Sequence, residues 1–370
     1  MSAAEDRRFL ALALSLGRRG QGRVWPNPAV GCVIVKNGRI VGRGWTAPGG
    51  RPHAEPIALA QAGAAAQGAT AYVSLEPCAH HGKSPPCADA LIAAGIARVV
   101  APLQDNDPRV AGQGFVRLRA AGVNVSTGLL ADEAKADHAG FFIRTEQGRP
   151  FVTLKLATSF DGRIATATGD SQWITAGTAR RLVHAMRMRH DAVMVGAGTA
   201  RADDPSLGVR GLGQTHQPVR VVVSRRLDLP LTGQLARTAR DTPVWLCHGP
   251  DVDEMLRRTW EDLGARLFRC DVRAGQLDPE SVLRALGGAG LTRVFCEGGG
   301  ALAASLMGAD LVDELVGMTA GAVVGAEGRA GIGALGLSRL SEAPRFKLIE
   351  TRAIGQDVLH VWRRSMNGAG

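Results

Sequence analysis

Four residues that can bind a metal ion or transfer a proton lie near the ends of predicted helices and strands in the first quarter of the chain. His53 and Glu55 open an expected helix over 54–66, and Cys78 and Cys87, each preceded by a proline, follow an expected strand over 71–75. One imidazole and two thiolates suit tetrahedral zinc with the fourth position open for water, the arrangement typical of catalytic rather than structural sites. Zinc lowers the pKa of that water toward 7. The spacing predicts a catalytic zinc site with ligands His53, Cys78 and Cys87.

Glu55 lies two residues beyond the first ligand and is not needed for coordination. It can carry a proton from the water to a leaving nitrogen, so we expect it to be catalytic. This arrangement is similar to the His-x-Glu and Pro-Cys pattern of zinc nucleobase deaminases. That pattern has Cys-x-x-Cys, whereas eight residues separate Cys78 from Cys87 here, so the insert must loop out beside the metal. The alternative is a structural zinc site, but such a site would give the Glu55 carboxylate no chemical role.

The insert adds a more specific resemblance. The run Glu76-Pro-Cys-Ala-His-His-Gly-Lys-Ser-Pro-Pro-Cys87, with Pro26-Asn-Pro-Ala-Val-Gly31 upstream, resembles the deaminase half of the bifunctional riboflavin-biosynthesis deaminase/reductase family. The resemblance implies a diaminopyrimidinone ribosylamine 5′-phosphate substrate that loses its 2-amino group as ammonia. The roles of four residues stay open between substrate contact and ordinary loop or turn chemistry: Asn27, His80, His81 and Lys83.

One lysine stands out in the second half. Only five of the 44 basic side chains are lysines, yet Lys155 lies inside the apolar strand expected over 151–157. Alternation along a strand places Lys155 on the opposite face from Leu154 and Leu156, so it can line a cleft at the strand end. The alternative is a lysine that snorkels from an edge strand.

A glycine run over 298–300 leads from an expected strand over 293–296 into a helix over 302–307, where free amides and the helix dipole can hold a pyrophosphate. It is not the six-residue Rossmann fingerprint. Together with the segments 159–165, 171–175 and 196–205, the run 294–301 resembles the reductase half of the same family, whose fold is similar to dihydrofolate reductase and whose cofactor is NADPH. The resemblance covers nearly the whole chain in the expected order.

The resemblance implies two sets of binding residues. Around the substrate it places Ser171, Arg187, Leu207, Arg210 and Glu297. Around the cofactor it places Ala157, Trp173, Thr199, Asp203, Ser224, Gly299, Gly300, Ala301, Leu302, Ala303, Ala304 and Ser305. Arg187 and Arg210 suit phosphate clamps, because guanidinium binds phosphate oxygens in a bidentate manner. Ser224 with Arg225 can hold the 2′-phosphate of NADPH, and Arg181, Arg189 and Arg226 are assigned to the solvated surface.

Reduction at C1′ requires the ribose ring to open, because hydride needs an electrophilic carbon. We expect Lys155 and Asp203 to be the acid/base pair of this step: Lys155 assists protonation and orients the substrate, and Asp203 stabilises the iminium or donates the proton.

Two domains must position these residues. In 370 residues, strands and helices alternate, and the polar stretch 144–150 with Pro150 marks a boundary, so we expect domains at 1–147 and 148–370. The expected elements are helices at 5–19, 54–66, 88–94 and 114–121, a hairpin at 29–35 and 39–44, and strands at 71–75, 98–102, 124–127, 151–157, 192–195, 219–223, 244–247 and 293–296. The predicted fold class is α/β: an N-terminal cytidine-deaminase-like three-layer domain and a C-terminal dihydrofolate-reductase-like α/β domain.

Composition excludes several classes. The net charge of +10 is spread over both halves, and 16 aromatic residues do not suggest a stacking platform for single strands, so we expect a small phosphorylated substrate and no nucleic acid. Six cysteines do not make a disulfide framework, and neither a signal peptide nor an apolar stretch of about 18 residues is present. We expect a cytoplasmic protein without a membrane partner. We also expect a homo-oligomer, a dimer or tetramer.

The leading hypothesis is a bifunctional enzyme: zinc-dependent deamination of the pyrimidine, then NADPH-dependent reduction of the ribosyl group to ribityl. A deaminase acting on another nucleotide or on tRNA, with a C-terminal half that only binds, is the enzymatic alternative. A nucleic-acid-binding protein with structural zinc is the third class, suggested only by the positive charge.

Overall fold

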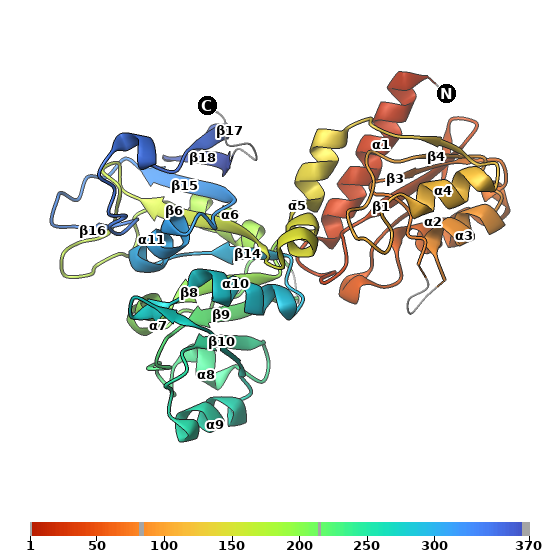
Figure 1. The fold of residues 1–370 in the computed structure, drawn as a ribbon. Helices are drawn as coiled ribbons and strands as arrows, with labels where there is room; N and C mark the ends of the chain where they lie inside the picture. The colour runs from red at the N-terminus through yellow and green to blue at the C-terminus, as the bar shows by residue number, and fades with distance from the viewer. Residues whose placement is uncertain (1, 81–84, 214–215, 365–370) are drawn as a thin grey trace. The chain divides into compact units, whose positions relative to one another are not determined.

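The computed structural model describes residues 2–80, 85–213 and 216–364. The chain divides into two compact units, Met1–Gly148 and Arg149–Gly370, and each unit is built on its own β-sheet (Figure 1).

The first unit is a five-stranded sheet in the order β2-β1-β3-β4-β5. β1 pairs antiparallel with β2 and with β3, while β3, β4 and β5 run parallel. Its elements are α1 (Ala3–Gly17), β1 (Gly31–Lys36), β2 (Arg39–Trp45), α2 (Ala54–Ala62), β3 (Thr70–Val73), α3 (Cys87–Ala93), β4 (Arg98–Val100), α4 (Gln113–Ala120), β5 (Asn124–Ser126) and α5 (Ala131–Gln147), with short 3₁₀ turns η1 (Arg18–Gly20), η2 (Pro48–Gly50) and η3 (Gly63–Ala66).

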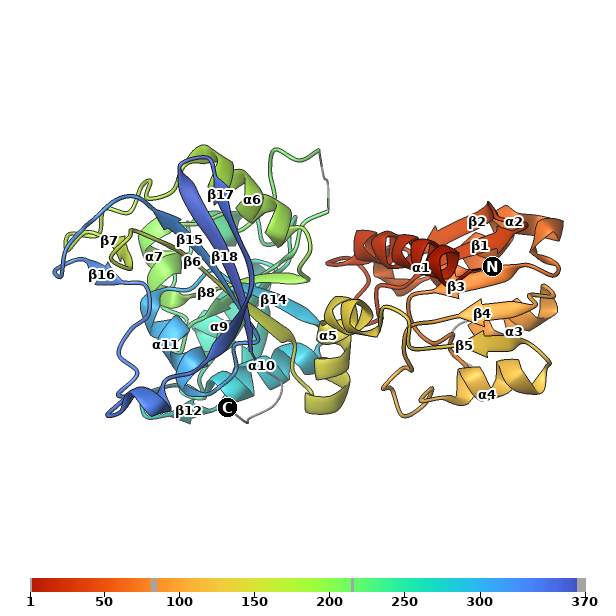
Figure 2. The same cartoon turned by 90° about the horizontal axis from the view of Figure 1, so that it is seen from above.

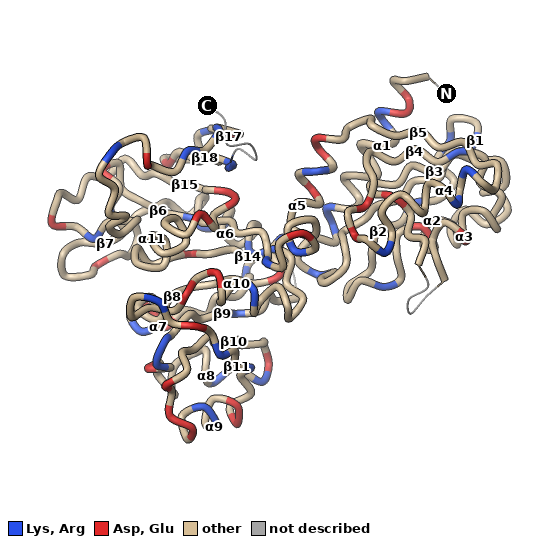
Figure 3. Tube along the Cα trace, in the orientation of Figure 1, with Lys and Arg blue, Asp and Glu red and all other residues tan. Residues whose placement is uncertain are grey.

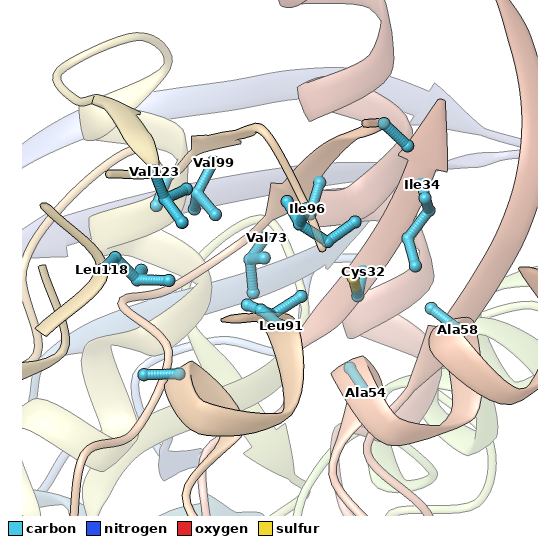
Figure 4. Packing of buried hydrophobic residues seen from close by; sticks show 14 of the residues in the cluster. Cys32, Ile34, Ala54, Ala58, Val73, Leu91, Ile96, Val99, Leu118 and Val123 are labelled. Atoms are coloured by element: carbon cyan, nitrogen blue, oxygen red, sulfur yellow. The ribbon is translucent and has the colours of Figure 1, made fainter. Parts of the chain in front are cut away.

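Helices cover both faces of this sheet, which gives three layers. Small apolar side chains of α2, including Ala54 and Ala58, pack with Leu91 of α3 and Leu118 of α4 against one face (Figure 4). The other face is covered by apolar residues of α1 and by Leu130 and Ala134 at the start of α5. The sheet is therefore buried on both sides, as parallel strands require.

The β1–β2 hairpin turns at Asn37 and Gly38, which have φ angles of 50° and 74°. Two residues with positive φ define the primed turn that the Asn-Gly dipeptide favours, so this prediction is confirmed. Further along β2, a Cβ on Gly42 would lie 2.1 Å from the carbonyl oxygen of Ala58, and one on Gly44 would lie 2.5 Å from that of Ala54. The missing side chains let α2 approach the sheet closely, and the start of α2 carries His53 and Glu55.

The second unit contains a nine-stranded sheet in the order β11-β10-β9-β8-β14-β6-β15-β18-β17. Neighbours from β11 to β15 are parallel, and β15–β18 and β18–β17 are antiparallel. The nine strands of this sheet are β6 (Phe151–Thr158), β8 (Ala192–Gly196), β9 (Val219–Val223), β10 (Val244–His248), β11 (Arg266–Arg269), β14 (Arg293–Cys296), β15 (Glu314–Ala320), β17 (Phe346–Ile354) and β18 (Asp357–Arg364). Four short strands of the unit lie outside it: β7 (Arg163–Ala165), β12 (Val272–Arg273), β13 (Gln276–Leu277) and β16 (Arg329–Ala330). The helices are α6 (Gly177–Arg187), α7 (Ala197–Asp203), α8 (Gln234–Arg237), α9 (Glu254–Asp262), α10 (Pro279–Gly288) and α11 (Gly300–Gly308), with the 3₁₀ turn η4 (Leu340–Glu342).

Two clusters hold this sheet in place. Ala179 and Val183 of α6 pack with apolar residues of β14, β15 and β18, and Trp260 of α9 packs with those of β8, β9 and β10. Figure 2 shows the elements of this unit from above. Because β6, β8 and β14 are adjacent and parallel, their carboxyl ends meet at one edge of the sheet, where ligands of α/β proteins bind.

The predicted strands are all present, with boundaries shifted by a few residues. The prediction missed α5, and the polar stretch that it treated as a linker begins inside the last turn of this helix. The buried residues of α5 are Ala134, His138, Gly140 and Ile143, a face too small and polar to produce a clear hydrophobic period. In the described part of the chain, no helix has both the length and the apolar character that a membrane crossing needs.

The close approach of α2 to β2 generates a stability prediction. Gly42→Ala forces a methyl group against the backbone of α2, so we expect a loss of about 1–3 kcal/mol in the free energy of unfolding and lower zinc retention. Thermal unfolding and metal analysis measure both effects. Gly288→Ala is the control, because its added methyl meets no atom within 4 Å. Equal stability of the two variants would contradict the packing argument.

Candidate active sites

The first unit holds a cavity of about 330 Å³ that is lined by His53, Glu55 and Cys78. His53 is the N-cap of α2, Cys78 follows β3, and Cys87 is the first residue of α3. The Nδ1 atom of His53 lies 3.7 Å from Sγ of Cys78 and 3.3 Å from Sγ of Cys87. Tetrahedral zinc with bonds of about 2.3 Å to sulfur and about 2.0 Å to nitrogen separates such ligands by about 3.5 Å. The three predicted ligands therefore form a cluster of the right size and chemistry for zinc.

Glu55 is buried in the first turn of α2 and lines the same cavity. Burial raises the pKa of this carboxyl to about 7, with a further rise from the charge of Cys78. The carboxyl is within hydrogen-bonding reach of Cys87. A group with this pKa can both take up and release a proton near neutral pH.

The two thiols differ in their surroundings. Hydrogen bonding from Cys87 lowers the pKa of Cys78 to about 4, and the backbone N–H of Cys87 donates to the Cys78 sulfur over 3.3 Å. The same thiol contact raises the pKa of Cys87. Cys78 is thus prepared as a thiolate ligand by the amide at the start of α3.

Glu76 anchors the loop that carries Cys78. Its carboxylate accepts four backbone hydrogen bonds, from Asp105 (3.0 Å), Gly112 (2.9 Å), Gly114 (2.8 Å) and Phe115 (3.2 Å). Two of these amides belong to the first turn of α4, where a carboxylate is favoured by the helix dipole. The sequence analysis quoted Glu76 only as part of a motif, and its role is to hold the metal-binding loop.

Further residues line this cavity. Asn27 donates to the carbonyl of Gly50 over 2.8 Å, so its amide also orders the loop on the rim. His80 lines the cavity, whereas His81 and Lys83 lie outside the described residues. The sequence analysis missed Thr46, Arg51, Asp105, Asp107, Arg109, Phe141, Arg144 and Thr145. The acidic run at 105–107 comes shortly after β4, and that position beyond a parallel strand is the signal that would have found it.

The second unit holds a cavity of about 1000 Å³ near the carboxyl ends of β6, β8 and β14. It brings together many residues that the resemblance implies: Lys155, Ala157, Ser171, Trp173, Arg187, Thr199, Asp203, Leu207, Arg210, Glu297 and Gly299. β6 lies between β14 and β15, so the alternative of an edge-strand lysine is wrong.

Lys155 shares its wall of the cavity with an ion pair. Glu297 accepts from Nε and Nη2 of Arg187, the second contact being 2.9 Å, and both side chains are largely buried. Burial lowers the pKa of Lys155, while the charge of Glu297 raises it and that of Arg187 lowers it further. A lysine so placed releases its proton more easily than one in water.

Asp203 closes α7 and lines the same cavity, where partial burial raises the pKa of its carboxyl. Trp173 is exposed on the cavity rim, with the guanidinium of Arg180 4.7 Å from its ring centre.

Other implied cofactor residues lie apart from the cavity lining. The Ser224 hydroxyl is buried and donates to Asp228 over 3.1 Å, and Ala303 packs in the core. Gly300, Ala301, Leu302, Ala304 and Ser305 belong to α11, which begins directly after the cavity residue Gly299. The sequence analysis missed Arg180 and His184, and Arg181, which it assigned to the surface, is exposed and also lines the cavity.

Comparisons with known proteins agree with this geometry. Residues 3–102 match the cytidine and deoxycytidylate deaminase zinc-binding region, and residues 150–360 match the RibD C-terminal domain. The predicted fold class, with its deaminase and dihydrofolate-reductase-like halves, is confirmed.

Full-length relatives carry both halves. The riboflavin biosynthesis protein RibD of Escherichia coli K12 is 43% identical over 363 residues, an alignment that covers 96% of this chain and 99% of that protein. The structure of Acinetobacter baumannii RibD matches with a TM-score of 0.88 at 36% identity, covering 99% of this chain and 100% of that one. A Thermotoga maritima structure described as a diaminohydroxyphosphoribosylaminopyrimidine deaminase/5-amino-6-(5-phosphoribosylamino)uracil reductase matches with a TM-score of 0.86 at 33% identity, covering 98% and 99%. The chain therefore belongs to the RibD family, the bifunctional deaminases and reductases of riboflavin biosynthesis.

Proposed function

We propose that the first unit deaminates 2,5-diamino-6-ribosylamino-4(3H)-pyrimidinone 5′-phosphate and that the second unit reduces the ribosyl group of the aminouracil product to ribityl with NADPH. The observation that carries this proposal is the pairing of two cavities in one chain. One holds a His/Cys/Cys cluster beside the buried Glu55, and the other holds Lys155 beside Glu297. The named activities of the Thermotoga relative support the choice of substrate.

In the deaminase cavity, His53, Cys78 and Cys87 would hold zinc. When bound, zinc supplies Lewis acidity that lowers the pKa of a water molecule. Glu55 takes a proton from the attacking water and delivers it to the leaving 2-amino nitrogen, which departs as ammonia. Its burial, which raises its pKa to about 7, suits it to both steps.

In the reductase cavity, the ribosylamine ring must open before C1′ can accept hydride, and NADPH supplies that hydride when bound. Lys155 assists protonation of the ring oxygen and orients the substrate. Asp203 stabilises the iminium or donates the proton, and the partial burial that raises its pKa favours the donating role. Glu297 holds Lys155 electrostatically and is itself held by Arg187.

The cofactor would lie along the side of the cavity formed by Ala157, Trp173, Thr199 and Gly299. Gly298 and Gly299 both have positive φ, and a Cβ on Gly299 would lie 2.8 Å from Oγ1 of Thr199. This turn needs glycine and presents the N-terminus of α11, from 300 to 305, to a pyrophosphate. Ser224 would serve the 2′-phosphate only if its hydroxyl left Asp228.

We also propose a cytoplasmic location, because all six cysteines are free thiols and zinc-binding thiolates persist in a reducing compartment. A homo-oligomer, dimer or tetramer, stays a prediction.

The test is incubation with the diaminopyrimidine substrate, with and without NADPH, with both products resolved by mass. We expect ammonia and the aminouracil without NADPH, and the ribityl product only with NADPH. Deamination with no NADPH oxidation would instead favour a deaminase whose second half only binds.

For the metal, we expect Cys78→Ser and Cys87→Ser each to lower zinc occupancy and deamination, since each removes a thiolate ligand. Metal analysis of the purified proteins measures the loss, and Cys247→Ala, a buried cysteine of β10 in the second unit, is the control. Full zinc content in both serine variants would mean that the ligand assignment is wrong.

For proton transfer, we expect Glu55→Gln to slow deamination about a hundredfold or more while zinc content and NADPH-dependent reduction stay intact. The amide has nearly the shape of the carboxylate but cannot shuttle a proton. Ammonia release near the wild-type rate would remove Glu55 from the mechanism.

For the reductase, we expect Lys155→Ala and Asp203→Ala each to slow single-turnover NADPH oxidation by roughly a hundredfold or more at saturating substrate. Deamination in the same chain is the internal control and should be unchanged. A variant that only raises KM, with the maximal rate intact, would show that its residue binds substrate and is not catalytic.

A further inference from the structure

Two cysteines that the proposed mechanism does not use lie beside each other in the second unit. Cys247 is in β10, and Cys270 directly follows β11. These strands are parallel neighbours in which Cys247 pairs with Phe268. The ladder continues with the N–H of Cys270, which donates to the carbonyl of His248 over 2.8 Å. Because Cys270 is two residues beyond Phe268, its side chain lies on the same face of the sheet as that of Cys247.

The two thiols are in contact and are closed off from solvent. Their sulfur atoms are within hydrogen-bonding reach of each other. Cys247 is 0% exposed and Cys270 is 2% exposed, and both are free thiols. Two thiols in contact need only the loss of two electrons and two protons to become a disulfide.

The surroundings make Cys270 the more reactive of the two. Hydrogen bonding from Cys247 lowers the pKa of Cys270, opposed by burial and by the charges of Asp271 and Asp278. The same contact, together with burial, raises the pKa of Cys247. The thiolate is the nucleophile in thiol oxidation, so Cys270 attacks an oxidant first and Cys247 resolves the product.

Cys270 also lies where the sheet opens most easily. β11 is the edge strand of the nine-stranded sheet, and Cys270 joins it to β12, whose residues Val272 and Arg273 are exposed. Figure 3 shows that basic and acidic residues are interspersed in this unit, so the described part of this edge offers a charged oxidant no field of one sign. A small, uncharged oxidant such as hydrogen peroxide therefore suits the buried thiols best.

The carboxyl end of β10 supports the segment 224–225, which the family resemblance assigns to the cofactor. The carbonyl of Cys247 accepts from the N–H of Ser224 over 3.0 Å. Just beyond it, the N–H of Gly249 donates to the carbonyl of Arg225, also over 3.0 Å. A disulfide bond is about 2.05 Å long, shorter than a hydrogen bond between thiols, so its formation must draw the two cysteines together. The backbone hydrogen bond passes this displacement on to Ser224.

We propose that Cys247 and Cys270 form a dithiol site that peroxide oxidises to a disulfide, and that this disulfide displaces the segment 224–225 and weakens NADPH binding. The effect on NADPH rests on the proposed reductase function, whereas the disulfide itself does not.

The oxidation has two steps. The Cys270 thiolate attacks the peroxide, an S–O bond forms as the O–O bond breaks, and the released hydroxide takes up the proton that Cys270 lost on ionising. The Cys247 thiol then attacks the sulfenic acid of Cys270, so the S–S bond forms, the S–O bond breaks and a second water leaves. The peroxide gains the two electrons that the thiols lose, and a dithiol reductant reverses the change.

The first test treats the zinc-loaded protein with a small excess of hydrogen peroxide and maps its cysteines by peptide mass. We expect a peptide pair joined through Cys247 and Cys270, lighter by two hydrogen atoms than the separate thiols and restored by a dithiol reductant. Backbone hydrogen exchange at Ser224 should be faster in the oxidised protein, and this readout needs no turnover. Absence of the disulfide, or unchanged exchange at Ser224, would overturn the inference.

The second test compares KM for NADPH before and after oxidation, once the peroxide has been removed. We expect oxidation to raise the wild-type KM about tenfold, the scale of one lost hydrogen bond, and to change that of Cys270→Ala less than about twofold. Cys32→Ala, which removes a buried thiol of β1 in the first unit, is the matched control and should stay as sensitive as wild type. Cys270→Ser makes the same comparison if the alanine variant folds poorly.

Equal sensitivity of Cys270→Ala and wild type would overturn the inference, because peroxide would then act at other cysteines, the zinc ligands among them. An unchanged KM in wild type whose disulfide has been mapped would overturn the link to the cofactor. If reduced wild type fails to oxidise NADPH with the aminouracil, the proposed function fails. The disulfide map and the exchange at Ser224 then still decide whether the dithiol site exists and moves the segment 224–225.

Discussion

A charge taken out of water needs an opposite charge, a set of hydrogen-bond donors or a proton, and both cavities are organised by this constraint. Glu76 and Glu55 both line the deaminase cavity and meet the constraint in different ways. Glu76 is surrounded by four backbone amides, so its carboxylate holds the loop to the start of α4. Among the described residues, Glu55 has no comparable set of donors, and burial raises its pKa to about 7. The Glu76 carboxylate therefore stabilises the loop, and the Glu55 carboxyl is suited to proton transfer.

The reductase cavity uses a row of alternating charges for the same purpose. Arg187 is paired with Glu297, and Glu297 faces Lys155. Truncation of Glu297 would leave two cations near one another in a partly buried wall, so the three residues must act as a unit.

Close packing of the backbone also fixes the positions of the metal ligands. Gly42 and Gly44 allow α2 to lie against β2, and the N-cap of α2 is His53 itself. Cys87 begins α3, whose Leu91 packs into the same core as Ala54 and Ala58 (Figure 4). Two ligands therefore sit at the ends of helices that the core fixes, and the third sits on the loop that Glu76 fixes. The zinc site depends on the close packing of small residues as much as on its ligands.

The sequence by itself determined the zinc ligands and the family, because ligand chemistry resides in residue types and because His53, Cys78 and Cys87 lie at element ends that local patterns reveal. It also determined that Lys155 faces a cleft, since strand alternation is a local property. Tertiary structure alone decided which polar groups are already paired: Arg187 with Glu297, and Ser224 with Asp228. It also decided that α5 forms, because the helix is stabilised by packing of a small and polar face that carries little periodic signal. A hydrogen-bond partner 110 residues away in the chain leaves no trace in local spacing, so the pairing of Arg187 with Glu297 emerges only from the folded molecule.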